Sequence, residues 1–268
     1  MGILAKNYAI MRIQKLTTNN DFARAINHNA RQYGNTPGAD KSKAHLNIIT
    51  GPAPNYSIIK ENLSLRNKMI KDSTGYKVKK NRVRGFELLF AVNQNFMSNK
   101  ALRDEYFKLA EEWAKDTFGE HNFLNKIIHM DEDGACHCHI MVTCVDVDEK
   151  DQINKYCANH WVSDRQSLTA LQDSWHSKVE HLGLERGKSA KYTHNYHLTK
   201  QEYTKLLQKD IDNVRALPQE QQELLAVKGL RAQRQAEQIA EQIKSEEILR
   251  NINFNKLLED LSIDDFQL

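Results

Sequence analysis

Three histidines in the middle of the chain are the residues whose types and spacing best fit chemistry. His129 is separated from His137 and His139 by an Asp-Glu-Asp-Gly segment, a composition typical of a hairpin loop. Alternate residues of a strand point to the same face, so His137 and His139 should share a face, and a hairpin would bring His129 beside them. Three neutral imidazoles on one sheet face predict a site for a divalent metal ion with positions open for a substrate oxygen.

Two cysteines and two acids surround the histidines. Cys136 and Cys138 interleave with them, so a structural zinc site that uses a thiolate is an alternative. Strand alternation argues against it, because Cys138 should face away from its neighbouring histidines. Asp131 and Glu132 are candidates for orienting a ligand histidine through a hydrogen bond, and their alternative role is a solvated turn.

Two further polar groups lie in the first fifth of the chain. His28 and Arg31 are spaced to share one face at the end of a predicted helix. A histidine that binds no metal can serve as nucleophile or base, and an arginine beside it can clamp a phosphate. His45 and Asn47, which follow Lys43, would share one face of a short strand. By spacing alone, an ordinary polar helix end explains the first group better, and the second group is also a weak signal.

Positive charge is concentrated at the start of the chain. The net charge of +3 comes from +12 in residues 1–100 (17 Lys and Arg against 5 Asp and Glu), −5 in residues 101–200 (12 against 17) and −4 in residues 201–268 (9 against 13). Five cations fall within eight residues: Lys77, Lys79, Lys80, Arg82 and Arg84. Such a segment can follow a phosphate backbone, although lysines that merely solvate a loop remain an alternative.

The elements that must position these residues alternate between strands and helices. Apolar periodicity predicts strands at 8–16, 45–50, 86–92, 123–129 and 137–147, and helices at 57–71, 100–118 and 163–182. A further helix, with cap candidates at 17–21, should run to about residue 31. Ser98 is the expected cap of the third helix. We therefore expect an α+β fold, an antiparallel sheet with helices mainly on one face. Residues 1–198 would form this domain, and residues 199–268 a long helical extension for dimerisation or partner binding.

Composition narrows the class of protein. We find no apolar stretch in the 268 residues that is long enough to span a bilayer, and no signal-peptide pattern. The four cysteines lie between residues 136 and 157, which is no disulfide framework and favours a reducing cytoplasm. The absence of a His-Glu-x-x-His helix argues against a metalloprotease.

The order of these motifs resembles the MobV-type plasmid relaxases, the Pre/Mob (plasmid recombination/mobilisation) family of the HUH endonuclease superfamily. The resemblance covers about residues 8–195. It rests on His-x-x-Arg at 28–31, His-Leu-Asn at 45–47, His-x-Asp-Glu with His-x-His at 129–139, and Leu-Glu-Arg-Gly at 184–187. One departure is the loop at 133–136, which lacks the usual proline and has one extra residue.

The resemblance implies a metal-dependent enzyme that nicks one DNA strand at an origin of transfer, stays attached to the 5′-phosphate and later rejoins the ends. His28 would be the nucleophile, Arg31 would neutralise a phosphate oxygen, and Glu132 would buttress a ligand histidine. The three histidines would bind a divalent ion, Mn2+ before Mg2+ or Zn2+.

The resemblance also implies partners and a location. The origin hairpin and its adjacent single strand would contact the basic N-terminal third: Lys43, His45, Asn47, Lys77, Lys79, Lys80, Arg82 and Arg84. Homodimerisation through the C-terminal helices, other DNA-transfer proteins and a bacterial cytoplasm are further expectations.

Two alternatives remain open. One is a tyrosine-dependent HUH replication initiator or transposase, with Tyr33 as the nucleophile two residues past Arg31. The other is a non-catalytic, zinc-stabilised DNA-binding regulator that uses the Cys/His cluster structurally.

Overall fold

The computed structural model describes residues 7–32, 39–132, 136–147 and 153–187, with a few residues between 205 and 223. The chain divides into two compact units, one of residues 5–189 and one of residues 1–4 with 190–268. In the second unit, the amide of Ala216 donates to the carbonyl of Asp212 at 3.0 Å, which forms a helical turn. Tyr33, the hairpin loop at 133–135 and most of the predicted helical extension lie outside the described residues.

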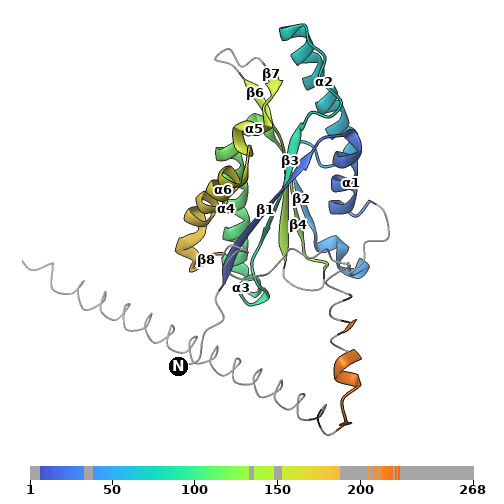
Figure 1. The fold of residues 1–268 in the computed structure, drawn as a ribbon, viewed down its shortest axis with the longest axis vertical. Helices are drawn as coiled ribbons and strands as arrows, with labels where there is room; N and C mark the ends of the chain where they lie inside the picture. The colour runs from blue at the N-terminus through green and yellow to red at the C-terminus, as the bar shows by residue number, and fades with distance from the viewer. Residues whose placement is uncertain are drawn as a thin grey trace, which may run out of the picture. The chain divides into compact units, whose positions relative to one another are not determined.

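A six-stranded sheet with the order β2-β4-β5-β3-β1-β8 forms the centre of the first unit (Figure 1). Its strands are β1 Tyr8–Leu16, β2 Ile48–Thr50, β3 Gly85–Ala91, β4 Phe123–His129, β5 His137–Thr143 and β8 Glu185–Arg186. All pairs are antiparallel except β1 with β8. A separate ribbon pairs β6 (Val145–Val147) with β7 (Ile153–Tyr156). The expected α+β class with a mostly antiparallel sheet is confirmed.

The helices are divided between the two faces of this sheet. They are α1 Asn19–Asn29, α2 Tyr56–Thr74, α3 Gln94–Ser98, α4 Lys100–Phe118, α5 Ala158–Trp161 and α6 Arg165–Val179, with 3-10 turns η1 Lys41–Leu46, η2 Glu120–Asn122 and η3 Glu180–Leu182. Helices α4 and α6 cover one face, and α1 and α2 cover the other (Figure 1). This layering differs from the expectation of helices mainly on one face.

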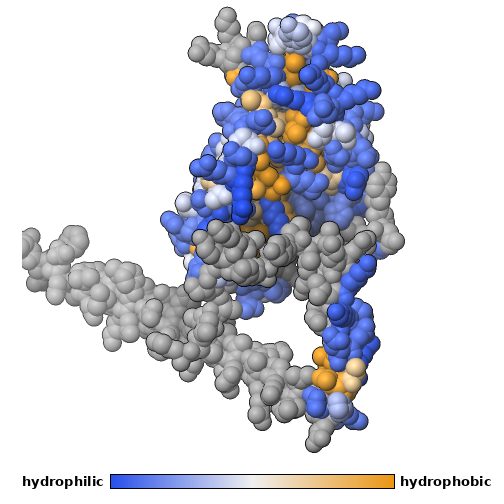
Figure 2. Space-filling model, viewed as in Figure 1, coloured by the Kyte–Doolittle hydropathy of each residue, from blue (hydrophilic) through white to orange (hydrophobic). Residues whose placement is uncertain are grey.

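The reason for the two helical layers is that the central strands are apolar on both sides. In β5, Cys138 and Ile140 enter the larger core together with α4 and α6. Met141 enters a second, smaller core with Phe22 of α1 and Ile59 of α2. Each apolar face must be covered to exclude water. Figure 2 shows that the face of the unit turned to the viewer is mostly hydrophilic, with a narrow apolar strip along its middle.

Helix α1 carries His28 in its last turn, and its start is fixed by a capping box. The hydroxyl of Thr18 accepts from the amide of Asp21 at 3.1 Å, and the Asp21 carboxylate accepts from the amide of Thr18 at 2.7 Å. This reciprocal pair satisfies two helix-end donors.

Two expectations about local structure are wrong in detail. His45 lies in η1, and β2 begins only at Ile48, so His45 and Asn47 do not share a strand face. The cap of α4 is Asn99 rather than Ser98: its side chain accepts from the amides of residues 101 and 102 at 3.1 and 3.2 Å. Ser98 instead ends the short helix α3. None of the described helices is long and apolar enough to cross a bilayer.

Candidate active site

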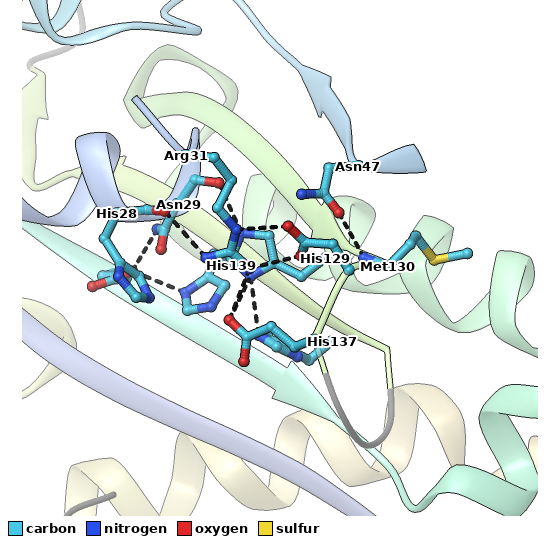
Figure 3. Close-up of polar contacts among 11 residues, drawn as sticks. His28, Asn29, Arg31, Asn47, His129, Met130, His137 and His139 are labelled. Carbon is cyan, nitrogen blue, oxygen red and sulfur yellow. Dashed lines mark hydrogen bonds and ion pairs between the residues drawn. The ribbon is translucent and has the colours of Figure 1, made fainter. Parts of the chain in front are cut away.

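The β4–β5 hairpin brings the three histidines together, as the sequence predicts. His129 pairs directly with His137, and His139 lies opposite Ile127. One ring nitrogen of each histidine lies within 4.8 Å of the other two. The closest approach, between Nδ1 of His129 and Nε2 of His137, is 3.0 Å (Figure 3). This is the one such cluster of potential ligands in the part of the chain that the structure describes.

The spacing of the cluster and the protonation state of His129 suit a divalent metal ion. Two nitrogens that are each about 2.1 Å from an ion, at an angle of about 90–110°, lie about 3.0–3.4 Å apart. The 3.0 Å separation between His129 and His137 fits this geometry. Burial lowers the pKa of His129 to about 2, so its imidazole is neutral and able to donate a lone pair. The cluster can therefore hold a divalent ion.

The cysteines do not complete this cluster. Cys138 is fully buried on the opposite face of the sheet, within the larger core. Burial raises the pKa of its thiol, so the thiolate that zinc requires is disfavoured. Cys136 is half-buried and precedes β5. A zinc site that includes Cys138 together with the histidines is excluded by the strand alternation.

Two residues that the sequence analysis missed hold the ligand histidines. Nδ1 of His139 donates to Oε1 of Glu87 at 2.9 Å, and Nε2 of His129 donates to the carbonyl of Asn29 at 2.8 Å. The side-chain amide of Asn29 donates to the same Glu87 oxygen at 2.6 Å. A signal for Glu87 was available, because it is the single acid in the apolar stretch 86–92.

Asp131 and Glu132 bind Arg31 instead of a ligand histidine. Nε and Nη2 of Arg31 donate to the two carboxylate oxygens of Asp131 at 2.9 and 2.7 Å, and Nη2 also donates to Glu132 at 2.8 Å. The hydrogen bonds from Arg31 lower the pKa of Asp131 to about 2. Glu132 lies 3.9 Å from Nδ1 of His129, too far for a hydrogen bond. The buttress expected of Glu132 is made by Glu87.

Arg31 itself has an unusual backbone. It follows α1 with a φ of 54°, a left-handed conformation that costs a residue with a side chain roughly 1–2 kcal/mol. Its amide donates to the carbonyl of His28 at 3.2 Å, and the amide of Gln32 donates to that of Asn27 at 2.9 Å. This pattern closes the helix in the Schellman manner. The ion pairs of Arg31 thus join the end of α1 to the segment after β4.

His28 lies beside the cluster without belonging to it. Its ring centroid is 6.5 Å from that of His129 (Figure 3). It is exposed, and it lines an open pocket of about 690 Å³ together with Glu87 and His139. Partial burial, with the charges of Arg31 and His139, lowers the pKa of His28. The ring is therefore mostly neutral at neutral pH and has a free lone pair.

The predicted contacts around residue 45 lie on η1 and just after it. Lys43 and His45 are exposed, and Lys43 forms an ion pair with Asp40 at 3.2 Å. Asn47 is half-buried, and its side-chain oxygen accepts from the amide of Met130 at 2.7 Å. Asn47 therefore fixes the backbone that follows β4, next to the histidine cluster (Figure 3).

The basic segment lies at the other end of the sheet. Four of its cations are exposed: Lys77, Lys79, Lys80 and Arg82. Arg84 is only 9% exposed, its Nε donates to the carbonyl of Thr17 at 2.8 Å, and its guanidinium lies over the ring of Phe22. The structure thus separates Arg84 from the predicted DNA-contact group because its side chain is buried, whereas Arg82, whose Nε also donates to a carbonyl, that of Tyr156 at 3.0 Å, stays exposed. Arg84 lies five positions before Leu89, the partner of His139, which corresponds to roughly 17 Å along a strand.

Comparison with known proteins identifies the family. Residues 5–205 match the family described as plasmid recombination enzyme, Mob_Pre. The chain belongs to this family. Over 193 residues it is 33% identical to the "65 kDa protein" of Zymomonas mobilis, covering 70% of this chain and 31% of that protein. Over 203 residues it is 27% identical to the plasmid recombination enzyme type 3 of Staphylococcus aureus, covering 71% and 46%. The Mob_Pre chain thus spans less than half the length of these relatives.

A solved structure of the same family shares the fold. The MobM relaxase domain (MOBV; Mob_Pre), Mn-bound and bound to oriT DNA of plasmid pMV158, superimposes with a TM-score of 0.61 at 23% identity. The match covers 75% of this chain and 98% of that domain. The family and fold that the motif order predicts are confirmed for this Mob_Pre member.

Proposed function

We propose that this Mob_Pre member is a plasmid mobilisation relaxase that nicks one DNA strand at an origin of transfer. One observation carries the proposal. His28 is exposed and lies outside the histidine cluster that could hold a metal ion, and its ring centroid is 6.5 Å from that of His129, a member of the cluster. Family membership and the shared fold of the MobM relaxase domain, whose structure contains oriT DNA, support it.

His28 would act as the nucleophile. A ring nitrogen attacks the scissile phosphorus, a P–N bond forms, and the bond from phosphorus to the 3′ oxygen breaks. That oxygen takes a proton from water and leaves as a 3′-hydroxyl, the ring of His28 gives up the proton on its other nitrogen to solvent, and the 5′-phosphate stays on His28. The lowered pKa of His28 keeps its lone pair available for this attack. Because the phosphoramidate preserves the bond energy, a 3′-hydroxyl can later reverse the step and rejoin the strand.

His129, His137 and His139 would hold the divalent ion. Mn2+ is the first choice because the MobM domain structure is Mn-bound, with Mg2+ and Zn2+ as alternatives. A bound ion would offset the charge that develops on the scissile phosphate. The protein's own contribution is to hold three imidazoles so that one nitrogen of each lies within 4.8 Å of the other two.

Arg31, Asp131 and Glu132 would act as a positioning group. Two carboxylates already offset the guanidinium charge, so Arg31 is poorly placed to neutralise a phosphate unless Glu132 releases it. We assign Arg31 first to holding the end of α1, and therefore His28, against the hairpin. Its contact with a phosphate oxygen stays a prediction.

DNA would be bound through the exposed cations and the polar residues of η1. We propose that the origin hairpin and adjacent single strand contact Lys43, His45, Lys77, Lys79, Lys80 and Arg82, with Asn47 supporting the site. Their charge makes binding salt-dependent. We place this activity in the bacterial cytoplasm. Dimerisation through the C-terminal helices and binding of other transfer proteins concern residues outside those described, and they stay predictions.

A nicking assay tests the proposal directly. Supercoiled plasmid that carries the cognate origin is incubated with Mn2+ and wild type, His28→Ala or Tyr33→Phe, and the products are compared with and without protease to reveal a covalent 5′ adduct. We expect loss of the adduct only in His28→Ala. Loss only in Tyr33→Phe would indicate the tyrosine mechanism. An absence of nicking by wild type would overturn the enzyme assignment and favour a DNA-binding regulator.

A further inference from the structure

Two polar residues connect the histidine cluster to the helix that carries His28. We infer that Asn29 and Glu87 form a bridge, here called the Asn29–Glu87 bridge, that orients two ligand histidines and couples metal binding to the end of α1. The inference rests on the proposed function, since it concerns the metal site and nucleophile of that reaction. Both are positioning residues, because they act through the histidines.

The Glu87 half of the bridge fixes His139. Glu87 pairs with Met141 across the β3–β5 ladder, and Leu89 pairs with His139, so Glu87 is the diagonal neighbour of His139 on the same sheet face. A carboxylate only accepts, so Nδ1 of His139 carries the proton in the 2.9 Å hydrogen bond. Nε2 then keeps the lone pair that a metal needs. The Glu87 and His139 side chains are only 12% and 15% exposed, so water competes weakly for this contact.

The Asn29 half of the bridge fixes His129. Asn29 is the last residue of α1 and is 2% exposed. Its carbonyl, one of the four that a helix end leaves without an intrahelical partner, accepts from Nε2 of His129 at 2.8 Å. The proton on Nε2 leaves Nδ1 of His129 free, and Nδ1 is the atom that faces His137.

The two halves of the bridge are coupled because Asn29 contacts both Glu87 and His129. Its side-chain amide donates to Glu87 at 2.6 Å while its carbonyl binds His129. The preceding residue is His28. A shift of α1 would therefore release both ligand histidines from their hydrogen-bonded orientation, and fixed ligands would in turn hold His28 in place. Loss of such supporting contacts typically weakens metal binding about 10–100-fold.

Calorimetric titration of the full chain with Mn2+, without DNA, tests the bridge. We expect Glu87→Ala to raise the Kd for Mn2+ about 10–100-fold. Asn29→Ala removes the amide that donates to Glu87 and keeps the backbone carbonyl that binds His129, so it should raise the Kd by a smaller factor, about 10-fold. Glu87→Gln should have a smaller effect because its amide oxygen still accepts from His139. The matched control is Glu111→Gln, which removes a carboxylate that binds Lys126 of β4 from α4, on the other face of the sheet. Its Mn2+ affinity should equal that of wild type.

A second readout separates positioning from general destabilisation. In 15N NMR spectra of the metal-free protein, His139 should be protonated at Nδ1 in wild type and Glu87→Gln, and a mixture of tautomers in Glu87→Ala. Folded Glu87→Ala and Asn29→Ala variants that bind Mn2+ as tightly as wild type would overturn the inference. If Glu87→Ala does not fold, unchanged Mn2+ affinity in Asn29→Ala, which loses the hydrogen bond to Glu87, overturns the inference equally. A wild type that binds Mn2+ but never nicks would refute the proposed function and leave the bridge supported.

Discussion

At the scale of single residues, Arg31 shows how a strained backbone and an ion pair can be linked. Its φ of 54° is unfavourable for a residue with a side chain. The guanidinium compensates by binding Asp131, whose side chain is 1% exposed and would otherwise be a buried unpaired charge. Strain of this kind persists only where surrounding contacts determine it, and it is often found at functional sites.

Two substitutions of Arg31 separate the ion pair from the strain. Arg31→Ala loses the ion pairs and keeps the strained backbone, so we expect a loss of about 3 kcal/mol of unfolding free energy. Arg31→Gly also loses the pairs but tolerates the left-handed conformation, so it should be about 1 kcal/mol more stable than Arg31→Ala. Urea denaturation measures both. If the two variants were equally stable, the left-handed backbone of residue 31 would not be strained.

The cysteines give a second prediction at this scale. Burial raises the pKa of the Cys138 thiol and raises that of Cys144 to about 12, whereas Cys136 and Cys157 are half-buried. Because the thiolate is the reactive form, iodoacetamide should label Cys136 and Cys157 in the native protein and spare the other two. Mass spectrometry of the digested protein identifies the sites. Rapid native labelling of Cys138 would show that it does not face the core.

At the scale of elements, helix ends and strand register place the site. The hairpin register sets His129 opposite His137, and the register of β3 against β5 brings Glu87 to the same face. A shift of one residue in either pairing would move these side chains to the opposite face. The C-terminal closure of α1 then determines where His28 lies.

Helix α4 offers a direct test of a cap. Asn99→Ala removes the side-chain oxygen that accepts from two first-turn amides, so we expect a loss of about 1 kcal/mol. Ser98→Ala is the matched control, since its hydroxyl only donates to the exposed carbonyl of Gln94, and its cost should be below about 0.5 kcal/mol. Thermal or urea unfolding compares the two. A larger loss from Ser98→Ala would restore Ser98 as the cap.

At the scale of the whole molecule, positive charge is distributed unevenly. The first hundred residues carry a net +12, and four exposed cations gather between α2 and β3, at the end of the sheet away from His139. A polyanion that contacts both the pocket beside His28 and this segment must extend along α1, because Lys79 and Lys80 line a pocket with Thr18 and Asn19 at the start of that helix.

The salt dependence of DNA binding tests this arrangement. Lys79→Ala and Lys80→Ala should each weaken binding to origin DNA and reduce the slope of log K against log salt by about 0.7–0.9, one phosphate contact each. Lys178→Ala is the control, because Lys178 of α6 pairs with Asp116 of α4 on the opposite face; its slope should equal that of wild type. Fluorescence anisotropy across a salt series measures the slopes. Unchanged slopes in both variants would exclude this segment from the DNA interface.

The sequence by itself determined the local features of this protein. Alternation along 137–139 and the loop composition after His129 were sufficient to predict a hairpin with three convergent histidines, because strand periodicity is a property of consecutive residues. The strand 123–129 and the helix 100–118 were predicted with the bounds that the structure has. The order of motifs was sufficient to identify the family.

Only the tertiary structure decided which distant side chains meet. Glu87 and Asn29 are 52 and 100 residues away from the histidines that they hold, and no local pattern encodes such contacts. The same holds for Arg84. Its place in a basic segment predicts an exposed side chain, but its guanidinium binds the carbonyl of Thr17 and lies over the ring of Phe22. The strand order likewise decides which strands are central, and the central strands, apolar on both sides, must be covered by helices on both faces. Periodicity acts along the chain, whereas these contacts depend on how strands far apart in sequence pair.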